Sequence, residues 1–572
     1  MFAGSDGCSL ARHIIQGRWF MVFGSFLIMS AAGATYIFAI YSKEVKSTLG
    51  YNQQELNTLA FFKDLGANVG ILSAIVGELA PPWVVLSIGA VMNLSGYLLI
   101  YLSLTGHIPH PKLWQMCLFI AVGANSQTFA NTGVLVTCVN NFPESRGIIL
   151  GLLKGFVGLS GAIFTQLYLA FYGHDSKSLV LLIAWLPAAI SIVFVHTIRI
   201  IKIVRQANEF RVFCYFLYIS LALAAYLMAM IIIQRNFTFP PIGYRVNAGA
   251  IILLLFLPLL VVIKQEFLLW KQKRSTTSNT TLVEITTLPT PPSAETAETA
   301  ATVTATSSSN PSKKFSLGAM FKPPKRGEDY SIIQSIVSID MVIIFFASMC
   351  GLGGVLTAVD NMAQIGESLG YPSASIGVFI SLTSIWNYLG RVFSGFVSEM
   401  LLSRYKFPRP LMFAIILFIC CFGHLLIALG FPGTLYLASV IMGFCLGAQM
   451  PLIFSIISEL FGLKYFATLY NIGNLASPLA SYILNVRIAG HLYDRETAKQ
   501  NKGTTTCIGV DCFKLSFLII AALTMLGALV LLFLVWRTKD FYRGDIYAKF
   551  RVTGTEVVEK GTSDETKVDE NK

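Results

Sequence analysis

Charged residues are scarce in this sequence. Only 13% of its 572 residues are Asp, Glu, Lys or Arg, against roughly 25% in an average soluble domain. Apolar residues make up 55% of the chain, stand in long uncharged runs and give a mean hydropathy of +0.66. A soluble protein of this size needs more polar surface to cover its core. The scarcity of charge therefore argues against a large soluble enzyme and predicts an all-α membrane protein.

The sequence also lacks motifs of several enzyme and channel classes. The chain contains no GxxxxGK phosphate loop, no HExxH zinc pair and no TVGYG filter. Its seven histidines are scattered along the sequence. We therefore expect neither an enzyme nor a bound metal or cofactor.

The formal net charge of +12 is compatible with a nucleic-acid binder. The basic residues, however, lie mostly in short loops between apolar runs, a placement typical of proteins that are oriented in a membrane. We therefore expect a lipid bilayer, and no nucleic acid, as the partner of the basic residues.

Runs with few or no charges mark the membrane spans. The first run starts at Trp19 and is longer than the 7–15 residues of a cleaved signal, so we interpret it as a retained span. A span needs roughly 20 apolar residues, and about fourteen are predicted: 19–41, 58–77, 83–104, 113–138, 147–172, 178–198, 212–233, 246–263, 341–359, 373–390, 410–429, 434–458, 465–486 and 515–536.

The order of the spans predicts the domain organisation. Two sets of six spans, separated by two additional ones and a long loop, are typical of the major facilitator fold. The predicted regions are an N-terminal tail (1–18), a six-helix bundle (19–198), two additional helices (199–270), a largely disordered loop (271–335), a second six-helix bundle (336–536) and a C-terminal tail (537–572). Residues 275–311 are rich in Thr, Ser, Ala and Pro, which favours disorder. Lys and Arg in the loops place both tails in the cytoplasm.

Arg391, Gly395, Glu399 and Arg404 stand at the inner end of one predicted span. A glycine, an acid and following basic residues are similar to the cytoplasmic signature of major facilitator proteins. Gly395 would let two helices approach closely, and Glu399 would bind a helix N-terminus or a basic residue across the bundle. Such a contact would be a latch that breaks when the inner gate opens; the alternative is a basic anchor without a gating role. The equivalent place in the first half, 77–82, keeps an acid but lacks the arginines.

A set of polar residues inside the predicted spans supplies candidates for a solute site. Charges in hydrocarbon are costly, so a charged member must pair, face water or bind a ligand. Each Asn or Gln has a structural alternative, a hydrogen bond to a neighbouring helix. We hypothesise that Lys154 binds an anionic solute and that Asp64 is either a proton-coupling carboxylate or the partner of Lys63. The candidates are Lys63, Asp64, Asn125, Asn131, Lys154, Gln449, Asn471 and Asn474.

Cys507 and Cys512 stand five residues apart in a loop that the orientation places outside the cytoplasm. A pair in such a compartment is a candidate disulfide. The alternative is two unpaired thiols.

Four stretches of the sequence, 17–19 (GRW), 36–42 (YIFAIYS), 141–147 (NFPESRG) and 475–481 (LASPLAS), carry a family resemblance. Together they resemble the plant nodulin-like branch of the major facilitator superfamily, which includes the nuclear fusion defective 4-like proteins. The resemblance implies a plant source and relatives among oxalate/formate and monocarboxylate carriers. It does not supply the solute.

These observations predict a secondary active transporter that works by alternating access. The expected substrate is a small solute, an organic anion such as a monocarboxylate, with protons as the candidate coupling ion. The alternative is a membrane receptor or scaffold that kept the fold and lost transport. We expect a monomer in the plasma membrane, with the vacuolar and endoplasmic reticulum membranes as alternatives.

Overall fold

The computed structural model describes residues 2–51, 53–173, 175–201, 208–237, 240–286, 324–500 and 507–548. These residues form helices and no strand. Among them, eleven helices are long and apolar enough to span a membrane by length and composition. Three further passes are helical throughout but richer in polar residues: α7, η2 and α8 in sequence; α17; and α20 with η3. The described residues thus contain the fourteen passes that the sequence predicts.

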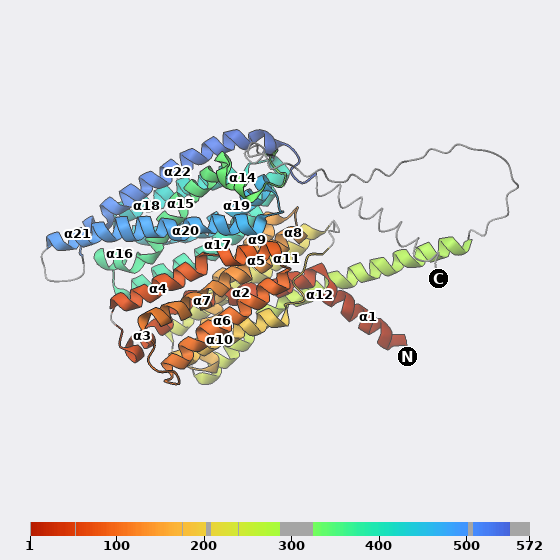
Figure 1. The fold of residues 1–572 in the computed structure, drawn as a ribbon, viewed down its shortest axis with the longest axis horizontal. Helices are drawn as coiled ribbons and strands as arrows, with labels where there is room; N and C mark the ends of the chain where they lie inside the picture. The colour runs from red at the N-terminus through yellow and green to blue at the C-terminus, as the bar shows by residue number, and fades with distance from the viewer. Residues whose placement is uncertain are drawn as a thin grey trace, which may run out of the picture.

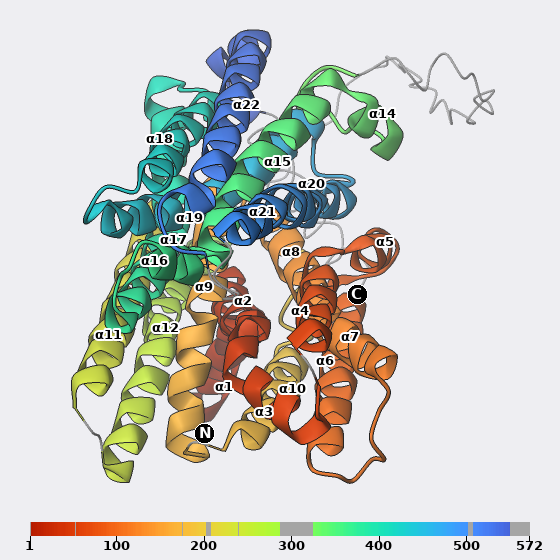
Figure 2. The ribbon, with the colours of Figure 1, turned by 90° about the vertical axis from the view of Figure 1, so that its left-hand side faces the viewer.

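The first six passes form one bundle, drawn from red to orange in Figures 1 and 2. Its elements are α2 (Arg18–Ala32), η1 (Gly33–Ile37), α3 (Phe38–Leu49), α4 (Gln53–Asn68), α5 (Ile71–Leu79), α6 (Pro82–Leu104), α7 (Leu113–Asn131), η2 (Thr132–Val136), α8 (Thr137–Asn141), α9 (Arg146–Phe171) and α10 (Ser176–Val193).

The last six passes form a second bundle, drawn from green to blue, which Figure 2 shows as a separate group of helices. Its elements are α14 (Ile332–Val337), α15 (Ile339–Asp360), α16 (Met362–Ser368), α17 (Ser373–Tyr405), α18 (Arg409–Leu429), α19 (Thr434–Phe461), α20 (Phe466–Ser481), η3 (Tyr482–Gly490), α21 (His491–Gln500) and α22 (Asp511–Arg543). The predicted break after residue 429 is present: Gly430 and Gly433 have φ of 59° and 80°, angles that glycine adopts at helix ends.

The two additional helices, α11 (Glu209–Asn236) and α12 (Pro241–Thr286), are fastened to the start of α2. Arg18 Nη2 lies 2.9 Å from Glu209 Oε2, and the Trp19 amide donates to Glu266 Oε1 over 3.1 Å. Gly17 has no room for a side chain, because an added Cβ would overlap the Glu266 carboxylate. The Gly17-Arg18-Trp19 sequence therefore fixes both extra helices to the first bundle.

The region expected to be a disordered loop is partly ordered. Helix α12 continues through Thr286, because neither proline nor glycine interrupts residues 259–288. Before α14, Asp329 Oδ1 accepts hydrogen bonds from the amides of Leu463 and Lys464, and the Tyr330 amide donates to Phe461 O over 3.0 Å. Residues 324–331 are thus fixed to the second bundle, whereas 287–323 lie outside the described residues.

The molecule has two distinct ends. Helix α1 (Phe2–Gln16), the extension of α12 and the end of α22 lie at one end, which we term the tail end (Figure 1). Helix α21 and the start of α22 lie at the other, which we term the disulfide end because it carries Cys507 and Cys512.

Candidate functional site

The two bundles approach each other most closely between α9 and α17. A Cβ added to Gly151 would lie 2.8 Å from Arg391 O and 3.0 Å from Gly395 Cα. Glycines on both helices therefore bring the two backbones into contact, as small-residue faces do in membrane proteins. The predicted Gly395 lies at this contact.

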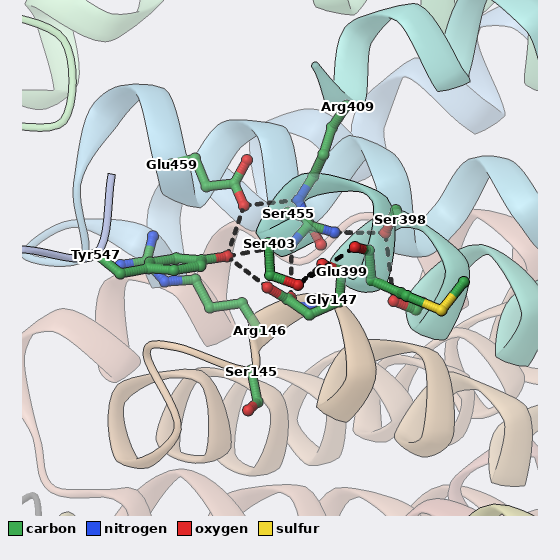
Figure 3. A network of polar contacts seen from close by, with 12 residues as sticks. Ser145, Arg146, Gly147, Ser398, Glu399, Ser403, Arg409, Ser455, Glu459 and Tyr547 are labelled. Atoms are coloured by element: carbon green, nitrogen blue, oxygen red, sulfur yellow. Dashed lines mark hydrogen bonds and ion pairs between the residues drawn. The ribbon is translucent and has the colours of Figure 1, made fainter. Parts of the chain in front are cut away.

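Glu399 binds both bundles at the tail end (Figure 3). Its Oε2 lies 2.6 Å from Arg409 Nη2 in the second bundle and accepts a hydrogen bond from the Gly147 amide, 3.1 Å away, in the first. Gly147 is the second residue of α9, and the N-terminus of a helix favours a negative charge. Glu399 thus combines the two contacts that the sequence offered as alternatives.

Arg409 stands at the centre of a buried charge cluster. It is 0% exposed, and its Nε donates to Glu459 Oε1 over 2.7 Å. Nearby, Arg146 of the first bundle donates from Nη1 to the Ser458 carbonyl oxygen of the second bundle over 2.8 Å. Two arginines and two glutamates, Glu399 and Glu459, therefore balance in charge where the bundles meet.

The predicted latch motif is only partly assembled. Arg404 is exposed and stacks on Tyr405, with its guanidinium carbon 5.7 Å from the ring centroid. Arg409, five residues further on, pairs with Glu399 instead. Arg391 faces the first bundle and donates to Lys154 O over 2.6 Å. Counting charges in a loop does not identify which arginine turns inward, so the sequence did not single out Arg409.

A second carboxylate makes a contact between the two bundles, on the opposite side of the tail end. Glu78, at the end of α5, accepts a hydrogen bond from the Thr468 amide over 3.0 Å. Thr468 is in the first turn of α20, so this contact resembles that of Glu399 with α9. In the part of the chain that the structure describes, Glu78 forms no ion pair.

Lys154 lies on the seam between the bundles, about 12 Å along α9 from Arg146 at 1.5 Å per residue. Its side chain is buried, and Nζ donates to the Tyr470 hydroxyl of the second bundle over 2.7 Å. Asn131 Oδ1 lies 3.4 Å from the same nitrogen. The aromatic rings of Tyr470 and Phe454 lie 5.3 and 5.4 Å away, which adds cation–π attraction.

The second pass is interrupted close to Lys154 and its contacts. Helix α4 ends at Asn68 and α5 begins at Ile71. Asn125 Nδ2 donates to the carbonyl oxygens of Gly66 and Val69, each 2.8 Å away, which satisfies backbone groups that the break exposes.

Asn471 reaches the interruption from α20 of the second bundle. Its Nδ2 donates to Thr132 Oγ1 over 2.9 Å, and a Cβ added to Gly70 would overlap its Oδ1. Thr132 opens the π-helical segment η2 and follows Asn131, the contact of Lys154. The structure therefore brings Asn125, Asn131, Lys154 and Asn471 into one polar layer, where interrupted helices of transporters commonly hold their sites.

The remaining candidates lie elsewhere. Lys63 Nζ is 2.8 Å from Asp64 Oδ1, on the part of α4 toward the disulfide end. Gln449 is 0% exposed inside the second bundle, with its side-chain oxygen against Gly351. Asn474 is buried on α20, one turn from Asn471.

Two further contacts lie at the disulfide end. Asp360, at the end of α15, accepts a hydrogen bond from Asn485 Nδ2 over 3.2 Å. It lies close enough to Lys63 and Asp64 for their charges to interact. Cys507 and Cys512 are joined by a disulfide.

A cavity of about 560 Å³ opens at the tail end beside α5 and α20. Its lining includes Thr132, whose hydroxyl accepts a hydrogen bond from Asn471. The polar lining is contributed by both bundles: Glu78, Asn140, His196, Arg199 and Lys464.

Comparison with known families gives two adjacent matches. A model described as Nodulin-like matches residues 18–263, and one described as the NFD4 C-terminal domain matches residues 329–543. The protein Nuclear Fusion Defective 4 of Arabidopsis thaliana is 25% identical over 542 residues, covering 92% of this chain and 89% of that protein. Together the two matches span most of the described chain.

Two transporters, XylE and FucP, are among the solved structures similar to this chain. A double-tryptophan variant of XylE superposes with a TM-score of 0.53 at 13% identity, over 91% of this chain and 95% of its own. The proton:xylose symporter XylE bound to a sugar analogue gives 0.49 at 12% identity, over 93% and 96%. The Escherichia coli fucose:proton symporter FucP gives 0.42 at 13% identity, over 90% and 98%. At these identities the XylE variant supports the fold and nothing finer.

Proposed function

The chain belongs to the nodulin-like branch of the major facilitator superfamily, and we propose that it carries a small organic anion across a membrane by alternating access. The family and the fold make it a multi-pass membrane transporter and not an enzyme. The observation that carries the choice of an anion is the position of Lys154, a buried cation on the seam between the bundles.

The contacts of Lys154 leave its charge uncompensated. Its two side-chain partners, Tyr470 and Asn131, are neutral, and no carboxylate of the described chain lies within ion-pair distance of Nζ. A buried cation without a counter-charge is costly inside a membrane. A solute carboxylate would supply the missing charge and would contact both bundles, since Tyr470 belongs to one and Lys154 to the other.

The structure supports a state that is closed at the tail end. We place this end in the cytoplasm because the loops there carry most of the Lys and Arg. Glu399, Arg146 and Lys154 all make hydrogen bonds across the seam between the tail end and the polar layer. Opening to the cytoplasm requires these contacts to separate, so the charge cluster is the proposed inner latch.

The disulfide end holds groups suited to an outer gate. Lys63 belongs to the first bundle and Asp360 to the second, and their charges interact across the seam. We propose that they form a direct ion pair when the outer side closes. Asp64 would release Lys63 for this pair on taking up a proton, which gives protons a route to couple with transport.

Uptake into proteoliposomes tests the proposed function. A panel of small mono- and dicarboxylates is offered with and without a pH gradient. Lys154→Ala should lower the uptake rate of the accepted anion by about tenfold or more, because a charge-assisted hydrogen bond is lost, whereas Lys154→Arg should retain part of it. Lys264→Ala, on the exposed surface of α12, is the matched control.

Two outcomes would overturn this proposal. Uptake unchanged in Lys154→Ala would remove that residue from the site. Folded protein that transports none of the tested solutes but binds a protein partner would favour the receptor alternative.

A further inference from the structure

The chain beyond the last membrane span returns into the charge cluster, where the Tyr547 hydroxyl points toward Glu459 and Glu399 (Figure 3). We propose that the C-terminal tail is a working part of the inner latch and that Tyr547 holds the two bundles together at this end. The inference rests on the proposed function in one respect, that the tail end opens and closes.

Local structure directs the tail inward. Helix α22 ends at Arg543, and Gly544 is extended. Asp545 then closes a turn: its Oδ1 accepts from the Tyr547 amide over 3.2 Å, and its carbonyl oxygen accepts from the Ala548 amide, also over 3.2 Å. The turn places the Tyr547 side chain in the protein interior, where the residue is 6% exposed.

The Tyr547 hydroxyl contacts three members of the charge cluster. It donates to Glu399 Oε1 over 2.9 Å, lies 3.3 Å from Glu459 Oε1 and accepts from Arg409 Nη2 over 3.2 Å. Burial, together with the two carboxylates, raises the pKa of Tyr547 above its ordinary value, so the phenol keeps the proton that it donates.

These contacts link the tail to the first bundle. Glu399 uses one oxygen for Tyr547 and the other for the Gly147 amide, so the tyrosine orients the carboxylate toward α9. The guanidinium carbon of Arg146 lies 5.8 Å from the centroid of the Tyr547 ring, within range of a cation–π contact. Tyr547 therefore touches a side chain of each contact that joins the cluster to the first bundle.

Tyr547 acts as a positioning residue, because it touches the latch and not the polar layer. Without it, water reaches Glu399 and Arg146, and their contacts across the seam lose the advantage of a dry environment. The closed state should then be less populated, whereas the second bundle keeps its Arg409–Glu459 pair.

Distance measurements between spin labels test the proposal without a solute. Labels are placed at His196→Cys in the first bundle and Arg404→Cys in the second, both exposed at the tail end, in full-length protein that otherwise keeps only its disulfide cysteines. Truncation after Gly544 should raise the ratio of long to short distances about tenfold, the effect of losing a hydrogen bond to a charged group. Truncation after Ala548, which keeps Tyr547, should leave the ratio unchanged.

The same assay distinguishes whether Tyr547 orients Glu399 through its hydroxyl or only packs its ring against the charge cluster. Tyr547→Phe keeps the ring and removes the hydroxyl, so it should give an intermediate shift, and that shift should vanish in a Glu399→Gln background. Equal distance distributions for both truncations would overturn the proposal. Should the shorter chain fail to fold, an unchanged distribution in folded Tyr547→Phe would overturn the role of the hydroxyl. Failure of anion uptake leaves these outcomes unaffected.

Discussion

Replacing Arg409 with methionine should destabilise the second bundle. The guanidinium is fully buried and lies 2.6 Å from Glu399 and 2.7 Å from Glu459. Methionine has a similar length but carries no charge, so two buried carboxylates lose their shared partner. Breaking a buried pair in this way costs about 3–5 kcal/mol, and here one cation serves two anions. We therefore expect a cost at the upper part of that range.

Thermal unfolding of the purified protein in lipid nanodiscs measures this cost. Arg409→Met should lower the unfolding midpoint strongly. Arg409→Lys should recover part of the loss, because it restores the charge but not the planar fork that reaches both carboxylates. Adding Glu459→Gln to Arg409→Met should also recover stability, since it removes one of the stranded charges. This recovery distinguishes charge imbalance from lost packing.

Arg404→Met is the matched control, because Arg404 is exposed and only stacks on Tyr405. It should leave the midpoint unchanged. Equal midpoints for Arg404→Met and Arg409→Met would refute the assignment of Arg409 as the buried centre of the cluster. A double variant no more stable than Arg409→Met alone would refute the charge-balance argument.

Three further predictions concern the seam and the disulfide end. Asn125→Leu should destabilise the protein by about 2–3 kcal/mol in thermal unfolding, because two carbonyl oxygens at the helix break lose their donor; an unchanged midpoint would contradict this. Gly395→Val should force α9 and α17 apart and lengthen tail-end spin-label distances, since even a Cβ would overlap Gly147 O; unaltered distances would show that the helices need no close approach. Mass spectrometry of non-reduced peptides should find Cys507 and Cys512 linked, and two free thiols would disprove the bond.

The sequence predicts the fold well because each membrane span can be recognised from its own residues. An uncharged run of sufficient length needs no knowledge of its neighbours, which is why the passes and the break after residue 429 agree with the structure. The end of α12 was harder to predict. Its composition indicated disorder, yet the residues after Lys273 continue a helix that no proline stops.

The sequence indicates which polar residues belong to the candidate site, but it does not indicate which side chains they contact. Lys154, Asn131 and Asn471 stood out because polar groups are rare inside spans, and all three lie in the polar layer. Which side chains meet across the seam depends on helix rotation, which the sequence leaves open. Tyr470 and Tyr547 illustrate this limit: tyrosine is common near membrane surfaces, and nothing in either local sequence marks it as a partner of a buried charge.

Glu399 and Glu78 each take part in contacts across the seam at the tail end, but these contacts differ in strength. The difference predicts where opening begins. Beside Glu399, which accepts from the Gly147 amide, Arg146 makes a second hydrogen bond across the seam to Ser458, whereas Glu78 accepts from the Thr468 amide and borders the cavity. A carboxylate at a helix N-terminus contributes about 0.5–2 kcal/mol, and on the Glu399 side the charged hydrogen bond from Arg146 adds about 1.5–3 kcal/mol. The side formed by α5 and α20 should therefore open first.

Alkylation by a membrane-impermeant maleimide in inside-out vesicles measures this order of opening. Ala467→Cys, beside the cavity, should react faster than Val392→Cys, which packs against α9 on the other side; both native side chains are buried to a similar degree. Glu78→Gln should speed the first reaction and leave the second unchanged, because it weakens only the contact with Thr468. Equal rates at the two cysteines would mean that the bundles separate as rigid units along the whole seam.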